Sequence, residues 1–91
     1  MFKIREDFNL KELEKFGYEK WNAIYRKSVR NYKVDDTGTF YETIVIYKDS
    51  RIIASWLYND LCNVTWQTTM LLKNHYIQDL VEAGIVEMVK E

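Results

Sequence analysis

The sequence predicts a two-layer α+β domain in which an antiparallel sheet of four to five strands is packed by an N-terminal and a C-terminal helix. Residues 39–58, TFYETIVIYKDSRIIASWLY, hold two β-rich apolar runs around a polar break at 48–51, the pattern of a β-hairpin. Apolar residues recur at helical spacing on either side of it, over residues 9–17 and from residue 69 onward. Because the chain has 91 residues and no linker composition, we expect one domain spanning residues 1–91.

The N-terminal part is expected to begin with a strand or arm and to continue into a helix. Residues 1–8 alternate apolar and polar, which fits a short edge strand or an ordered arm. Asn9 is a candidate N-cap, and Glu12 completes the spacing of a capping box. Gly17 is placed to end the helix. One face of this helix is apolar: Leu10, Leu13 and Phe16.

Residues 18–34 alternate with a period of two. This predicts two strands with a turn near Lys27 and Ser28. A helix over residues 18–29 stays open as an alternative, because nothing in that stretch breaks one. Residues 35–38, Asp-Asp-Thr-Gly, predict a turn that leads into the central hairpin.

Both faces of the central hairpin are fairly apolar. On the first strand, one face carries Phe40, Glu42, Ile44 and Ile46, and the other carries Tyr41, Thr43, Val45 and Tyr47. This pattern fits a central strand that is covered on both sides. It equally fits a sheet with helices on one face and an aromatic, partly open surface on the other.

The C-terminal third predicts a strand followed by a helix. Residues 64–68 are β-branched and alternating, which favours a fifth strand, with the start of a helix as the alternative. From Thr69 the period becomes helical, and Gly84 is placed to end the helix. Residues 86–91 fit a short tail or edge strand. The apolar stripe of the helix is Leu72, Tyr76, Ile77, Leu80 and Ala83.

Composition limits where the chain acts and what it binds. The net charge is −1 and the pI about 5.8, so no global field attracts nucleic acid or a membrane. The single cysteine, Cys62, excludes a disulfide framework and fits a reducing compartment. Residues 1–10 lack the apolar region of a signal peptide, and no apolar run approaches the ~20 residues of a membrane span. We therefore expect a cytoplasmic protein with no membrane partner.

Two residue groups are weak candidates for chemistry. His75, Asp79 and Glu82 lie on the polar face of the predicted helix, where His75 and Asp79 could share a metal or a proton. A solvated helix face has the same composition, and the sequence offers no third ligand. Cys62 could pair with His75 as nucleophile and base, but the usual free cysteine is a small buried hydrophobe. We therefore expect no enzymatic activity, no cofactor and no metal.

The charge distribution is the more informative signal. Residues 18–33 carry five bases against the single acid Glu19, whereas residues 34–91 carry four bases against nine acids. The basic stretch is interleaved with aromatic residues, which suits an acidic protein partner or a nucleic-acid backbone with stacked bases. The low pI favours a protein partner. The predicted contact residues are Trp21, Tyr25, Arg26, Arg30, Tyr32 and Lys33.

Several segments resemble small uncharacterised proteins from phages and prophages of Gram-positive bacteria. The resemblance is carried by residues 4–7 with 10–17, by 50–53, and by 76–87. That group has no assigned activity, so the resemblance implies no functional residue. What it implies is a bacterial cytoplasm, an accessory gene and a binding role.

Together these observations predict a small non-enzymatic protein-binding module, such as a modulator or inhibitor of a bacterial protein. The alternative is a nucleic-acid-binding protein that uses the basic, aromatic segment 18–33. Self-association through an edge strand or exposed aromatic residues stays open.

Overall fold

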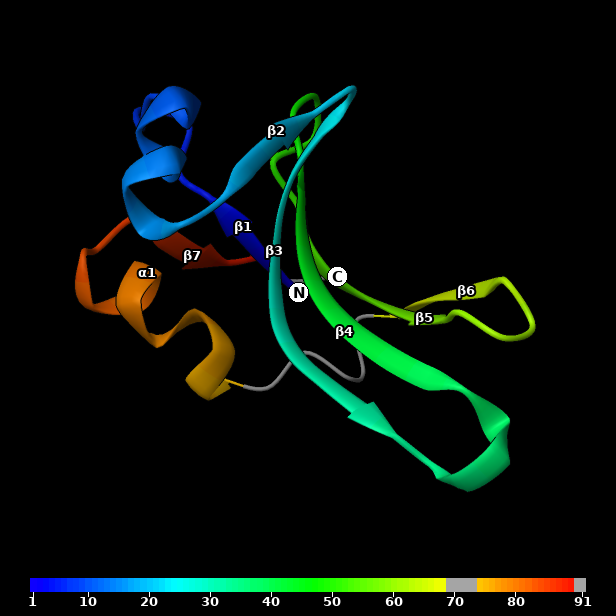
Figure 1. Ribbon diagram of the computed structural model, residues 1–91. Coiled ribbons are helices and arrows are strands. Elements are labelled where there is room, and N and C mark those ends of the chain that lie inside the picture. The colour runs from blue at the N-terminus through cyan, green and yellow to red at the C-terminus, as the bar shows by residue number, and fades with distance from the viewer. Residues whose placement is uncertain (69–73, 90–91) are drawn as a thin grey trace.

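The computed structural model describes residues 1–68 and 74–89 and is dominated by a five-stranded antiparallel sheet (Figure 1). Each strand of this sheet pairs with the next one along the chain, so the sheet is a meander with short connections. Its strands, in spatial order, are β2 (Glu19–Trp21), β3 (Ile24–Lys33), β4 (Thr39–Tyr47), β5 (Ile53–Asn59) and β6 (Val64–Thr68).

Short elements from the two ends of the chain complete the fold. β1 (Phe2–Ile4) and β7 (Val86–Met88) form a separate two-stranded antiparallel sheet. The helical segments are the 3₁₀ helices η1 (Leu10–Phe16), η2 (Asp35–Thr37) and η3 (Asn74–Ile77), and the α-helix α1 (Gln78–Glu82).

The predicted fold class, a sheet packed by two helices, is therefore wrong. The described residues are mostly β, and α1, the one α-helix among them, has five residues. The N-terminal helix is 3₁₀ because only seven residues separate its caps, too few for stable α-helical turns. Gly17 N accordingly donates to Glu14 O, three residues back, at 3.1 Å. Of the predicted C-terminal helix, residues 69–73 lie outside the described residues.

The ends of the first helix are where the sequence placed them. The Asn9 side chain accepts a hydrogen bond from Lys11 N at 3.1 Å, as an N-cap does. Gly17 has φ +89°, a left-handed conformation that favours glycine. Between them Leu13 is fully buried, so the predicted apolar face is confirmed at its centre.

Residues 18–34 form two strands as predicted, and the helical alternative is wrong. The turn, however, lies at Asn22 and Ala23, since Trp21 pairs directly with Ile24. Asn22 takes φ +51°, which asparagine tolerates in two-residue hairpin loops. At Ser28, where the turn was predicted, the β3–β4 register shifts in a β-bulge.

The central hairpin, the fifth strand and the turn at 35–38 are confirmed. β4 and β5 pair from Ile46↔Ile53 to Phe40↔Asn59. Gly38 has φ +92°, and a Cβ there would lie 2.6 Å from the Leu61 Cβ. No larger residue fits that turn without displacing the backbone.

The edge strands expected at 1–8 and 86–91 are present as β1 and β7, but they pair with each other. Ile4 lies opposite Val86, and a single bridge between Lys3 and Ile52 links β1 to the large sheet. Beyond the ladder, Val89 N donates to Met1 O at 2.8 Å.

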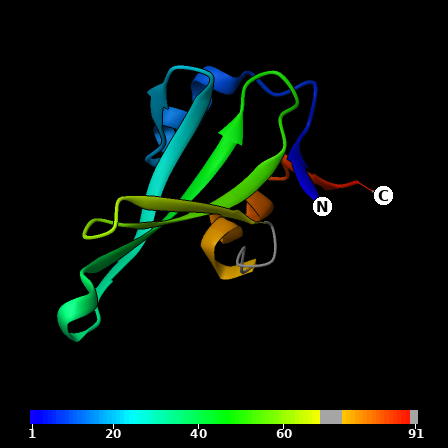
Figure 2. The same ribbon diagram turned by 90° about the vertical axis from the view of Figure 1, so that its right-hand side faces the viewer.

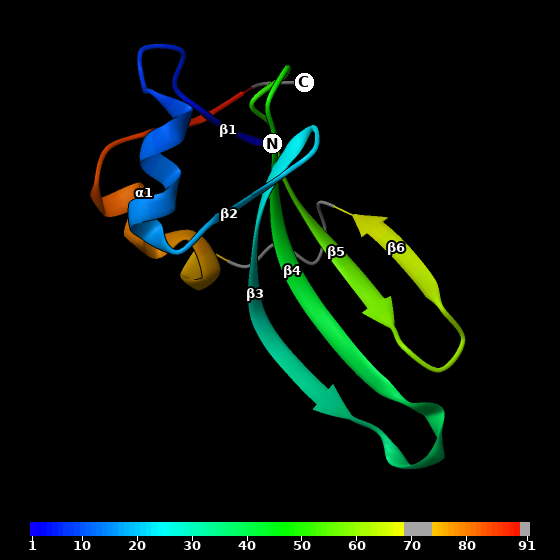
Figure 3. The same ribbon diagram turned by 45° about the horizontal axis from the view of Figure 1, so that its top comes forward.

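The main core lies on one side of the large sheet, which we call the inner face. η1, α1, β1 and β7 all lie on that side, and no described element packs on the opposite, outer face (Figures 1 and 3). The buried residues of the core come from the sheet and from these elements: Ile4, Leu13, Tyr18, Tyr25, Ile44, Ile46, Ile53, Ile77, Leu80 and Ile85.

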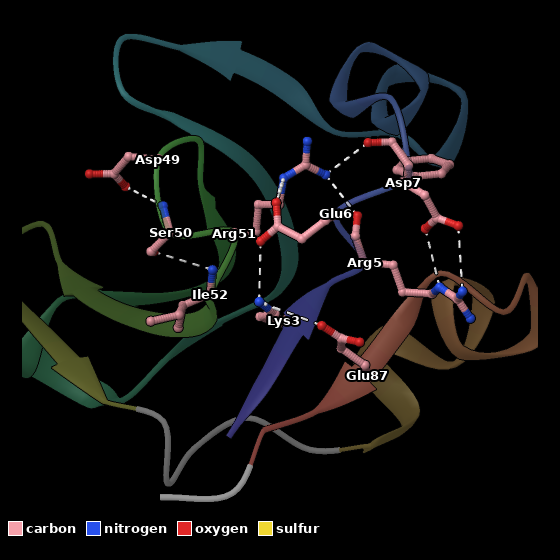
Figure 4. A network of polar contacts seen from close by, with 10 residues as sticks. Lys3, Arg5, Glu6, Asp7, Asp49, Ser50, Arg51, Ile52 and Glu87 are labelled. Carbon is pink, nitrogen blue, oxygen red and sulfur yellow. Dashed lines mark hydrogen bonds and ion pairs between the residues drawn. The ribbon is translucent and has the colours of Figure 1, made fainter.

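Arg51 fastens the N-terminal segment to the turn between β4 and β5 (Figure 4). Its Nη1 donates to the carbonyl oxygens of Arg5 and Phe8, both at 2.8 Å, and its Nε lies 3.4 Å from Glu6 Oε2. The backbone adds a bond from Ile4 N to Arg51 O at 2.9 Å. One partly buried guanidinium therefore satisfies two loop carbonyls that no strand or helix pairs.

The molecule is elongated, with principal extents of 45 × 26 × 22 Å. The far end of the β3–β4 hairpin extends beyond the elements of the core (Figure 2). No helix in the described part of the chain is both long and apolar enough to cross a bilayer.

Candidate functional site

The outer face of the large sheet holds a groove of about 390 Å³. Strand register puts Arg26 beside Val45 and Ser28 beside Thr43, and Thr43 beside Trp56, so alternate residues of three strands face the same way. We call this hollow the outer groove. It is lined by Trp21, Arg26, Ser28, Tyr41, Thr43, Trp56, Tyr58 and Thr65.

Small side chains on the central strands and large ones around them produce the outer groove. Ser28 and Thr43 are cross-strand partners with short side chains. Next to them the Tyr41 and Tyr58 rings pair across β4 and β5, with centroids 6.0 Å apart. Trp56 is fixed by its Nε1, which donates to the Tyr47 hydroxyl at 3.3 Å. The walls are therefore aromatic and ordered before any partner arrives.

Arg26 is the one charged residue among the described residues that line the groove. Its guanidinium lies 4.5 Å from the centre of the Trp21 ring, a cation–π contact. It also pairs with Glu19 at 3.5 Å, and the two side chains are 38% and 70% exposed. Exposed pairs contribute little to stability, so a partner's carboxylate can replace Glu19 at small cost.

A second group of aromatic residues lies on the inner face, away from the core elements. Phe40 stacks on Tyr32 at 5.5 Å and on Trp66 at 6.5 Å between ring centroids. The Arg30 guanidinium lies 4.8 Å from the Tyr32 ring centre. We call Tyr32, Phe40 and Trp66 the inner aromatic row.

The structure does not bring the six predicted contact residues together. Trp21 and Arg26 line the outer groove, whereas Arg30 and Tyr32 pair with Glu42 and Phe40 on the inner face. The bulge after Ser28 adds the residue that moves Arg30 to the other face. The two remaining predicted residues lie apart: Tyr25 is 4% exposed within the core, and Lys33 is exposed at the end of β3.

Six of the eight residues that line the groove were not predicted from the sequence, and three of those six are aromatic: Tyr41, Trp56 and Tyr58. The signal that points to them is the alternation along the central hairpin. It places Tyr41 with Thr43 on one face of the first strand, and Trp56 with Tyr58 on one face of the second strand. Their exposure could not follow from that alternation alone, because both faces of the hairpin are apolar.

Among the residues considered for catalysis, the three whose side chains the structure describes, Cys62, Asp79 and Glu82, are not gathered at one site. Cys62 is exposed in the turn before β6, so the expected buried thiol is wrong, and its Sγ lies 3.2 Å from Asn59 Oδ1. Asp79 lies 3.5 Å from Lys27 Nζ, and Glu82 accepts from Gln78 Nε2 at 3.2 Å. The side chain of His75 lies outside the described part of the structure. Among the described residues no group of three or more His, Cys, Asp or Glu side chains is placed to hold a metal ion.

Two tyrosines in and beside the core are perturbed by their surroundings. The Tyr76 hydroxyl donates to Glu42 Oε2 at 2.6 Å, and this hydrogen bond, followed by burial, raises the pKa of Tyr76. Burial, followed by the charge of Asp79, raises the pKa of Tyr18. Within the described residues the buried Tyr18 hydroxyl has no hydrogen-bond partner. Neither group faces the outer groove, so both act on stability.

Comparison of the chain with protein-family models, with curated proteins and with solved structures gives no significant match.

Proposed function

We propose that this chain is a small non-enzymatic protein-binding module and that the outer groove receives an acidic segment of the partner. The observation that carries the proposal is an ordered aromatic groove on a sheet face that no described element covers. Tryptophan, tyrosine and arginine dominate the energetics of protein interfaces, and all three line this groove.

Charge indicates the nature of the partner. Arg26 projects beside Trp21, where a partner carboxylate would meet both a guanidinium and a flat apolar ring. No carboxylate is among the described residues lining the groove, so an acidic segment meets no like charge inside it. Apolar neighbours of the partner's acidic residue would pack on Trp56 and on the Tyr41–Tyr58 pair.

The nucleic-acid alternative receives less support from the geometry. A phosphate backbone needs a continuous basic track with aromatic residues beside it. The basic, aromatic segment instead distributes its residues over both sheet faces, with Arg26 on one and Arg30 on the other.

The resemblance to prophage proteins gives the proposal its context. A partner would then be a bacterial protein met in the cytoplasm, and the module would act as its modulator or inhibitor. These are parts of the proposal and share its test.

Site-specific photocrosslinking in bacterial cells tests the proposal. Ser28→p-benzoylphenylalanine places the reactive group in the groove, and Glu82→p-benzoylphenylalanine on exposed α1 is the reference site. We expect protein adducts from position 28 that are absent at position 82. Trp21→Ala should reduce them at least about fivefold, and Trp66→Ala, on the opposite face, should leave them unchanged.

Charge variants test the acidic partner. Arg26→Gln should weaken adduct formation, and Glu19→Gln should strengthen it, because the second change frees the guanidinium. Equal yields with Trp21→Ala and Trp66→Ala would contradict the proposal. Adducts that disappear on nuclease treatment would show that the outer groove binds nucleic acid and not a protein.

A further inference from the structure

A second hollow, of about 300 Å³, lies where the start of η1, strand β2 and the β4–β5 turn meet. It is separate from the outer groove and shares no lining residue with it. We call it the basic hollow. Its lining residues are Asn9, Leu10, Lys11, Lys20, Tyr25, Lys48 and Arg51.

Four of these seven residues are cations, and none of the described lining residues is acidic. The whole chain, by contrast, has a net charge of −1. Like charges around one hollow repel each other, and an anion between them would remove that repulsion. A local excess of positive charge of this kind is what an anion-binding site requires.

Two of the cations are held in place by the fold. Lys48 Nζ donates to Asn22 O and lies 5.4 Å from the centre of the Tyr25 ring. Arg51 is held by the carbonyl groups of the N-terminal segment, and Glu6 offsets part of its charge at 3.4 Å. Their positions are fixed before a ligand binds, so the ordering cost of binding is small.

The other two cations are free to engage a ligand. Lys11 and Lys20 are exposed, and in the described part of the chain neither ammonium makes a hydrogen bond or an ion pair. Each ammonium carries three donors that can meet anionic oxygens. Lys15, by contrast, which is exposed on the same 3₁₀ helix as Lys11, lies 2.5 Å from Glu12.

We infer that the basic hollow binds phosphate groups, and linked phosphates better than a single one. Lysine and arginine are the side chains that recognise phosphate, and four of them around 300 Å³ suit a ligand with more than one charged group. This activity is independent of the proposed protein partner, because the two sites share no lining residue.

Titration of the full chain with inorganic phosphate, pyrophosphate and tripolyphosphate at constant ionic strength tests the inference. Backbone amide shifts in NMR spectra report both affinity and location. We expect saturable binding that tightens with each added phosphate, with shifts gathered at residues 9–11, 20 and 48–51. Lys11→Gln with Lys20→Gln should weaken tripolyphosphate binding about tenfold.

The matched control is Lys15→Gln with Lys33→Gln, which removes the same charge outside the basic hollow and should change affinity less than about twofold. Equal weakening by both double variants would show a general charge effect and overturn the inference. Absence of saturation, or shifts spread over all exposed lysines, would also overturn it. Thermal unfolding of each variant, without ligand, confirms that it is folded.

Discussion

The two faces of strand β4 show how the same stretch of chain supports two different surfaces. Ile44 and Ile46 on the inner face are fully buried beneath elements from both chain ends. Tyr41 and Thr43, which precede them on the same strand, face the uncovered outer groove. Covering one face stabilises the sheet, and the other face remains available for binding. Stability and recognition are therefore expected to respond to different substitutions.

Truncation of a core residue that covers the inner face should have the largest effect on stability. Leu80→Ala removes a fully buried side chain of α1 and should lower the free energy of unfolding by about 3 kcal/mol. Val81→Ala, next to it and 44% exposed, should change it by less than about 0.5 kcal/mol. Urea denaturation measures both, and similar losses would mean that α1 does not seal the inner face.

Substitution of Arg51 tests how strongly the N-terminal segment is held to the large sheet. Arg51→Ala removes the donor of the Phe8 carbonyl and one of the two donors of the Arg5 carbonyl, which also accepts from Phe8 N, and should cost about 2 kcal/mol. Arg51→Lys keeps the charge but loses the planar group in which Nη1 meets both carbonyl groups while Nε meets Glu6, so it should recover only part of that loss. The same denaturation experiment measures the series, and full recovery with lysine would show that the planar guanidinium is not needed.

Alkaline pH should reduce the contribution that two tyrosines of the inner face make to folding stability. The pKa values of Tyr18 and Tyr76 are raised above the ordinary value of 10.0, so the folded state holds these protons more tightly than the unfolded chain. Their contribution is complete below pH 10 and is lost as the pH rises above it, because the unfolded chain then releases its protons first. Thermal unfolding between pH 8 and 11 should show a flatter decline for Tyr76→Phe than for the wild type.

The smallest expected effect on the free energy of unfolding is a gain, not a loss. Tyr18→Phe removes a buried hydroxyl without a described partner and should leave stability unchanged or raise it by up to about 1 kcal/mol. Tyr25→Phe, at a neighbouring core position, serves as the comparison. A clear loss with Tyr18→Phe, measured by urea denaturation, would reveal a partner for that hydroxyl.

The parts of the fold with a strong local signal were predictable. Alternation over residues 39–58 around a polar turn predicted the central hairpin, and β-branched residues predicted β6. Caps at Asn9 and Gly17 predicted where η1 begins and ends. They could not predict its type, because the same caps serve a short 3₁₀ helix and an α-helix.

The parts that depend on distant residues were not predictable. Pairing of β1 with β7 joins the two ends of the chain, and neither segment specifies its partner by local pattern. The bulge after Ser28 reverses which side chains share a face, so a contiguous basic segment became two surfaces. Which face of the hairpin is open follows from where the end segments pack, not from the hairpin itself.

The β1–β7 ladder also has a consequence for the order of folding. Met88 pairs with Phe2, almost a full chain length away, whereas every pair in the large sheet joins consecutive strands. Closing the longest loop carries the greatest entropic penalty, so we expect the meander to assemble first and the chain ends to join last. Substitutions in the ladder should then accelerate unfolding and leave the refolding rate almost unchanged.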